Sequence, residues 1–241
     1  MVAIQILSDL HLEMSIKSYD TSNITPKAPY LALLGDIGLV KNKEQFTEFL
    51  THQLALFKSS WADAKSFLKD VEDLAQKRRL KDEGLGQFVA LDQTRYDIDD
   101  GWYDNMVTIL GCTLFSNVPP AATYAVHNKA HAADLVWLNT QIKQLEGAGR
   151  KVIIFTHHSP ATDTRANDPR HKNSPISSGF VTDLSSELCW KSKDVKLWAF
   201  GHTHYNCDFT DESTGKRVYT NQRGYDSEKA AGYDGDRVLE I

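Results

Sequence analysis

Short apolar runs alternate along the chain with stretches in which apolar residues recur at helical spacing. The apolar runs predict strands, six of them clear and three shorter ones near the end: 2–7, 30–34, 87–91, 107–110, 152–155, 195–200, 206–209, 217–220 and 238–241. Helical spacing predicts helices over 43–58, from Ser60 onward, and near 130–145. This alternation predicts a layered α/β fold, with mixed β-sheets flanked by helices.

The first two predicted helices follow one another without a strand between them. Lys43 to Lys58 carries an apolar stripe, and Ser60 is a good N-cap, with Asp63 three residues further on. In an α/β alternation a strand belongs between two such helices. The pattern therefore predicts a gap at the Lys58–Ser59 junction of roughly a dozen residues, about a strand and its loop.

The composition fits one soluble domain spanning residues 1–241. Hydrophobic residues make up 41% and charged residues 24% of the 241 positions, and no apolar stretch is long enough to cross a membrane. The first apolar run reads as a strand, not as a signal peptide. Three widely spaced cysteines argue against a disulfide framework and favour a cytoplasmic location. The net charge of −5 argues against non-specific binding of nucleic acid or anionic lipid, but a small phosphorylated substrate held by metal ions remains compatible with it.

Histidine and aspartate residues stand at the ends of four predicted strands. They are Asp9, His11, Asp36, His157, His158, His202 and His204. Ligands in open α/β sheets bind beyond the carboxyl ends of the strands, so we expect these side chains to converge. The D-x-H and H-x-H pairs would each share one face of extended backbone and hold one ion. Mixed carboxylate and imidazole ligands favour manganese, iron or zinc.

Each of these residues also has an ordinary structural interpretation. A single buried histidine is usually a hydrogen-bonded core residue, and a strand-end aspartate is often a helix cap. The recurrence at four strand ends favours metal binding. His157 and His158 are adjacent and would point to opposite faces, so we expect one ligand from this pair, with His157 the first choice and His158 the alternative.

The longest irregular stretch runs from Ser159 to Phe180. It contains three prolines and four basic residues that are candidates for substrate binding: Arg165, Arg170, His171 and Lys172. Loops of this length often carry function, so the segment is predicted either to frame the active site or to be a solvated surface loop.

Together, four motifs in this order resemble the calcineurin-like metallophosphoesterases. They are Asp9-Leu10-His11, Gly35-Asp36, Thr156-His157-His158-Ser159-Pro160 and Gly201-His202-Thr203-His204. The tail segment Asn221-Gln222-Arg223-Gly224-Tyr225 is also similar to small members of that family.

The resemblance implies a layered α/β fold of the metallophosphoesterase type and hydrolysis of a phosphate mono- or diester at a two-metal centre. By motif position, Asp9, His11 and His204 would hold the first ion. His202 would hold the second together with His157 or His158, which makes this pair part of the catalytic centre. Asp36 would bridge both ions. Two such ions activate water and neutralise the phosphate oxygens.

One motif of that family is absent from the sequence. A Gly-Asn-His segment, whose asparagine binds the second ion and whose histidine assists the leaving group, does not occur. Three explanations remain: the segment is missing from this chain only, it was lost from a spliced or mispredicted gene product, or the protein is an impaired member. An impaired member would hold one ion and act as a binding module for a phosphorylated ligand or a protein.

Overall fold

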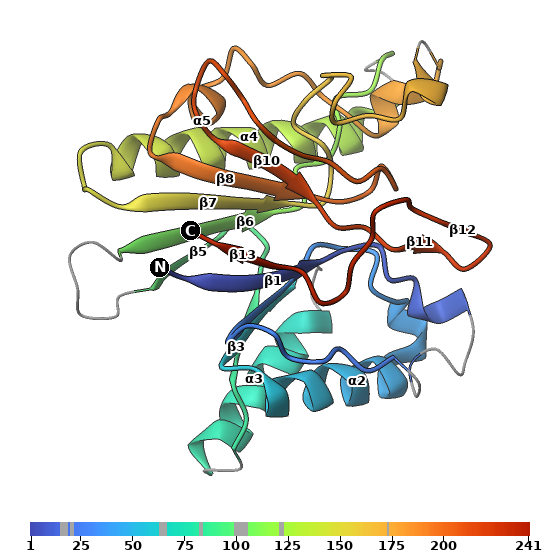
Figure 1. The fold of residues 1–241 in the computed structure, drawn as a ribbon, viewed down its shortest axis with the longest axis vertical. Helices are drawn as coiled ribbons and strands as arrows, with labels where there is room; N and C mark the ends of the chain where they lie inside the picture. The colour runs from blue at the N-terminus through green and yellow to red at the C-terminus, as the bar shows by residue number, and fades with distance from the viewer. Residues whose placement is uncertain are drawn as a thin grey trace.

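Two mixed β-sheets lie face to face, and helices cover the outer side of each (Figure 1). The computed structural model describes residues 1–14, 19, 22–62, 67–81, 84–98, 106–120, 123–172 and 174–241. Three cysteines in this part of the chain are free. None of its helices has the length and apolar character that a membrane crossing needs. The layered α/β prediction with mixed sheets and flanking helices is confirmed.

The first sheet contains five strands in the order β13-β1-β2-β3-β4. These strands are β1 (Ala3–Leu7), β2 (Tyr30–Leu33), β3 (Ser59–Ala62), β4 (Gln87–Ala90) and β13 (Val238–Glu240). The first four run parallel and β13 is antiparallel to β1. Helices α2 (Lys43–Leu56) and α3 (Phe67–Leu80) lie on the outer side of this sheet (Figure 1).

The second sheet contains six strands in the order β5-β6-β7-β8-β10-β9. Their bounds are β5 (Thr94–Ile98), β6 (Val107–Cys112), β7 (Lys151–Thr156), β8 (Val195–Phe200), β9 (Asp208–Thr210) and β10 (Arg217–Thr220). Strands β5 and β9 are antiparallel to their neighbours. Helices α4 (Ala125–Leu145) and α5 (Leu188–Lys191) cover the outer face, and β11 (Gly224–Tyr225) pairs with β12 (Glu228–Lys229) in a separate hairpin.

The central strands bury both of their faces. One apolar cluster fills the space between the sheets and includes Ile6, Leu34, Trp61 and Phe155. Two further clusters pack the outer faces of the sheets against the helices. Strands buried on both faces read as continuous apolar runs, which is why the sequence pattern predicts β1, β2, β7 and β8 within a residue or so. The pattern does not predict the half-exposed β5 or the two-residue strands of the hairpin.

The helix predicted from Ser60 begins later, as α3 at Phe67, and the strand that the sequence pattern lacked between the two helices is present. Residues 59–62 form β3, a parallel strand between β2 and β4. Hydrogen bonds to both neighbouring segments begin just before this strand: the Lys58 N–H donates to the Pro29 carbonyl at 2.8 Å, and the Lys58 carbonyl accepts from the Gln87 N–H at 3.0 Å. The proposed capping residue Asp63 lies outside the described residues.

Burial explains why this segment is a strand despite its helical spacing. Trp61 is fully buried between the sheets and stacks on Tyr30, with ring centroids 5.3 Å apart. A strand of four residues is too short to show its own alternation of apolar and polar positions. Pairing with β2 and β4, together with burial of the Trp61 indole, outweighs the preference of Ser60 for a helix cap.

Candidate metal centre

The structure gathers six of the seven strand-end candidates into two groups of three. One group is Asp9, His11 and His204, and the other is Asp36, His157 and His202. Within each group, one potential ligand atom from every residue lies within 4.8 Å of the others. These residues follow β1, β2, β7 and β8, and the arrowheads of β1 and β8 point to the same edge of the molecule (Figure 1). The predicted convergence at the strand ends is confirmed.

Most of these ligand candidates have left-handed backbone conformations. The φ angles are 52° at Asp9, 45° at His11, 45° at Asp36, 70° at His202 and 48° at His204. Non-glycine residues rarely adopt this region, and such residues cluster at functional sites where the surrounding structure holds them. The D-x-H and H-x-H pairs are therefore tight turns and not extended segments. The expectation that each pair holds one ion is wrong for His202 and His204, which belong to different groups.

Two glycines give the ligands room to pack. A Cβ atom on Gly35 would overlap the imidazole ring of His157. A Cβ atom on Gly201 would overlap the side chains of Ser8 and Asp9. Gly35 and Gly201 are therefore required, because side chains that follow other strands approach their backbone too closely for a Cβ atom.

The geometry of the first group suits a shared cation. His11 Nε2 lies 3.1 Å from His204 Nε2, which in turn lies 3.3 Å from Asp9 Oδ1. His11 Nδ1 is 2.9 Å from the Glu13 carboxylate, which accepts its hydrogen and leaves the lone pair on Nε2. Asp9 is fully buried, and its carboxylate accepts hydrogen bonds from the Ser8 hydroxyl at 2.5 Å and from the His202 N–H at 3.0 Å.

Asp36 lies between the two groups. Its Oδ2 is 3.6 Å from His157 Nε2 in one group and 4.0 Å from His11 Nε2 in the other. His157 Nδ1 donates to the Leu34 carbonyl at 2.9 Å, which fixes the tautomer with the Nε2 lone pair on the side of Asp36. One carboxylate is thus in reach of both groups.

The protonation states match those of metal ligands. Burial, with a smaller contribution from the neighbouring His157, lowers the pKa of His202 to about 4, so this imidazole is neutral near pH 7. Burial alone would raise the pKa of Asp36, but the nearby imidazoles of His157, His11 and His202 outweigh it and hold the pKa well below its usual range. Neutral imidazoles and ionised carboxylates are the forms that bind divalent ions.

His158 belongs to neither group and lies beside them. Its Nδ1 is 2.8 Å from the Ser116 hydroxyl, and its ring packs against Phe115, His127 and His202. Burial and the neighbouring histidines lower its pKa to about 2. Of the adjacent pair, His157 is the residue that belongs to one of the two groups.

The four basic residues of the Ser159–Phe180 loop are exposed and lie outside both groups. Arg165 pairs with Asp163 at 2.8 Å, and Arg170 pairs with Asp168 at 2.7 Å. Both guanidinium groups are thus partly neutralised by their own loop. A role in substrate binding for these residues, His171 and Lys172 included, stays a prediction.

Residues of the tail anchor the loop that carries His202 and His204. The Gln222 side chain accepts the His204 N–H at 2.6 Å and donates to the Thr203 hydroxyl at 2.9 Å. The Asn221 side chain donates to the Ile6 carbonyl in β1 at 2.9 Å. The sequence predicts no role for this segment, because no local pattern connects it with β1, more than 200 positions earlier in the chain.

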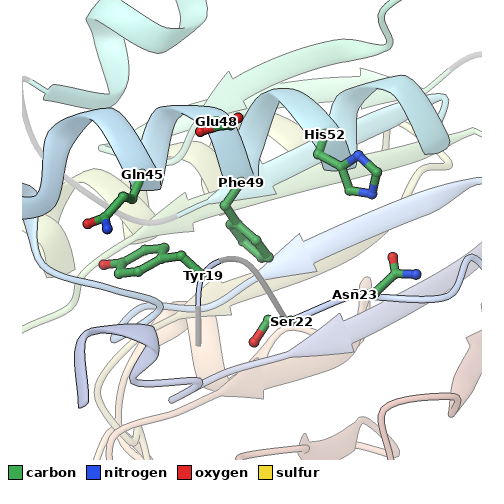
Figure 2. A pocket seen from close by; sticks show the side chains of 7 residues that line it. All are labelled: Tyr19, Ser22, Asn23, Gln45, Glu48, Phe49 and His52. Atoms are coloured by element: carbon green, nitrogen blue, oxygen red, sulfur yellow. The ribbon is translucent and has the colours of Figure 1, made fainter. Parts of the chain in front are cut away.

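A separate surface pocket lies between α2 and the side chains of Tyr19, Ser22 and Asn23 (Figure 2). Tyr19, Phe49, Glu48 and His52 are among its lining residues. None of the candidate ligands lines it, so the pocket is not part of the metal centre.

Comparison with known proteins supports the fold. No family model and no curated protein matches the sequence. Among solved structures, 23 chains match. One is the crystal structure of phosphopantetheinyl hydrolase from Mycobacterium tuberculosis, with a TM-score of 0.62 and 11% identity over 92% of this chain and 89% of that chain. The two proteins share a fold.

These findings overturn the family assignment made from the motifs. No family model supports membership in the calcineurin-like family, and the structural match is to a protein titled a phosphopantetheinyl hydrolase. Short motifs indicate which side chains stand at the strand ends, but they do not identify a family. They describe the local chemistry of a site and not the relationship of the whole chain. The ligand geometry described above does not depend on that assignment.

Proposed function

We propose that this protein is a metal-dependent hydrolase of phosphate mono- or diesters. The observation that carries the proposal is Asp36, whose Oδ2 lies within 4.0 Å of an imidazole nitrogen from each of two ligand groups. Paired sites with one shared carboxylate are typical of enzymes that cleave phosphate esters. The shared fold with a protein titled a hydrolase supports the same reaction class.

The described residues fit two divalent ions. Asp9, His11 and His204 would hold one ion, and His157 with His202 would hold the other. Asp36 would serve both. Bound there, the ions would act as Lewis acids toward the phosphate oxygens and supply the positive charge that an anionic ester needs near a protein of net charge −5. Manganese, iron and zinc suit these mixed oxygen and nitrogen ligands.

Residues behind the ligands preorganise the site. Glu13 holds His11 and the Leu34 carbonyl holds His157, each in the tautomer with a lone pair on Nε2. Gln222 holds the backbone of His204. Such supporting partners fix ring orientation and raise the basicity of imidazole ligands, and their loss typically costs about 10–100-fold in metal affinity or activity.

The substrate of the structural relative suggests one candidate among several. That protein is a phosphopantetheinyl hydrolase. A phosphopantetheinyl compound is a reasonable one to assay, together with simple phosphate monoesters and diesters. Esters with activated leaving groups scarcely need a proton donor, so we expect them to be hydrolysed faster than alkyl esters.

The test is metal analysis combined with hydrolysis assays. Purified protein would be loaded with manganese, iron or zinc, its bound metal would be counted, and its turnover of aryl and alkyl phosphate esters would be measured. We expect two ions per chain and hydrolysis of aryl esters that chelation abolishes. Two bound ions with no turnover on any ester would contradict the proposal and favour a module that binds phosphorylated ligands.

A further inference from the structure

An aromatic ring packs on each of the two ligand groups. The Tyr225 ring lies 4.4 Å from the His11 ring at an interplanar angle of 35°, and 4.6 Å from the His204 ring. The Phe180 ring stacks on His202 at 4.8 Å with an angle of 26°. The two aromatic residues come from different parts of the chain, so each group has an apolar wall supplied by a loop.

Tyr225 lies at the surface, and Phe180 is half-buried. Tyr225 is 42% exposed although it contacts two buried or half-buried imidazoles. Its hairpin lies at the edge to which β1 and β8 point (Figure 1). The hairpin and the Ser159–Phe180 loop also meet, since Arg170 Nη1 lies 3.2 Å from Glu228 Oε1. Loops that carry the two rings therefore border the same part of the surface.

We propose that Tyr225 and Phe180 form an aromatic wall that binds the organic part of the substrate, and that the preferred substrates are phosphate esters with a flat aromatic or heteroaromatic group close to the phosphorus. This rests on the proposed function, because it places the phosphate at the two ligand groups. A tyrosine offers a large rigid surface with few rotatable bonds, so contact with a flat group costs little conformational entropy. Offset or edge-to-face ring contacts add affinity beyond that of the area they bury.

The alternative is that the rings only brace the imidazoles. Bracing predicts that removal of a ring weakens metal binding and affects all substrates alike. A substrate wall predicts a loss confined to aromatic ligands, with metal content unchanged. The exposed surface of Tyr225 favours the wall, since a purely bracing ring would gain more stability from full burial.

The experiment compares two non-hydrolysable probes, phenylphosphonate and methylphosphonate. Their Kd values would be measured by calorimetry on manganese-loaded protein, with metal content determined in parallel. The variants are Tyr225→Leu and Phe180→Leu, which keep apolar bulk but remove the ring, and Tyr225→Phe, which keeps the ring. Tyr124→Leu is the matched control, because Tyr124 is 44% exposed at the start of α4 and contacts none of the ligand groups.

We expect the wild type to bind phenylphosphonate about tenfold more tightly than methylphosphonate, which corresponds to about 1.4 kcal/mol. Tyr225→Leu should reduce this preference about threefold to tenfold and leave methylphosphonate affinity and metal content unchanged. Tyr225→Phe and Tyr124→Leu should keep it. Equal affinities in the wild type, an undiminished preference in both leucine variants, or equal weakening of both probes would overturn the proposal.

These binding measurements, together with the hydrolysis assays described above, separate this proposal from the proposed function. A phenyl preference that Tyr225→Leu removes, in a protein that hydrolyses no ester, would leave the aromatic wall standing and reject the hydrolase. Hydrolysis of esters without any aromatic preference would reject the wall and leave the hydrolase standing.

Discussion

The Asp36 carboxylate lies 3.6 Å from the His157 imidazole, although the two residues follow strands of different sheets. Asp36 follows β2 in the first sheet and His157 follows β7 in the second. The hydrogen bond from His157 to the Leu34 carbonyl at 2.9 Å fastens the same two strand ends together. The candidate centre therefore forms only where the two sheets meet.

Replacement of the shared carboxylate should affect both ligand groups. We expect Asp36→Asn to lower turnover by more than about 100-fold and to release at least one ion. This loss exceeds the effect of removing a residue that only holds a ligand in place. A neutral amide offsets less of the repulsion between two cations than a carboxylate does. Metal content and kcat would be compared with Asp73→Asn, an exposed position on α3. Wild-type metal content and turnover in Asp36→Asn would rule out a two-metal site.

The two adjacent histidines should differ sharply. His157→Ala removes a member of a ligand group and should lower metal affinity strongly. His158→Ala should keep the bound metal and instead lower the free energy of unfolding by about 1–3 kcal/mol, because the buried Ser116 hydroxyl loses its partner. Metal titration and denaturant unfolding of both variants check this. Equal metal loss in the two variants would contradict the assignment of His157.

Close packing at Gly201 can be tested without altering any ligand. Gly201→Ala adds a methyl group that would overlap Ser8 and Asp9, so we expect weaker metal binding and lower stability. Gly235→Ala is the control, since the added Cβ atom would meet its nearest neighbour, the Tyr233 hydroxyl, at an ordinary 3.4 Å. Unaltered metal affinity in Gly201→Ala would show that the strand ends can separate at little cost.

A buried lysine should make stability depend on pH. Lys216 is fully buried, its Nζ donates to the Trp190 carbonyl, and burial lowers its pKa to about 8 from 10.5. Between these two values the unfolded chain binds more protons than the folded one, so this residue favours folding increasingly as pH rises from about 8 to 10.5.

The comparison with Lys216→Met isolates this contribution from other groups that titrate in the same range. Unfolding free energies of wild type and variant would be measured at several pH values. We expect the wild type to gain at most about 3 kcal/mol relative to the variant across this range. A difference that stays constant with pH would show that Lys216 titrates normally in the folded protein.

The sequence alone determined the layered α/β class and the strand ends that carry the candidate ligands. These features are local: a strand buried on both faces is a continuous apolar run, and polar residues directly after it are readable without a structure. Gly35-Asp36 and Gly201-His202 could also be recognised as unusual strand ends. The local pattern gave a wrong prediction at residues 59–62. Ser60 and the spacing of the apolar residues are typical of a capped helix, but the segment is a strand.

Only the tertiary structure decided how these local features combine. It made β3 a central strand by pairing both of its edges and burying Trp61 between the sheets. It gave the residues around the candidate centre left-handed backbone conformations, and it brought His157 rather than His158 to Asp36. The physical reason is that edge pairing, close approach at glycines and imidazole tautomers depend on groups distant in the chain, whose positions are set by the packing of one sheet on the other.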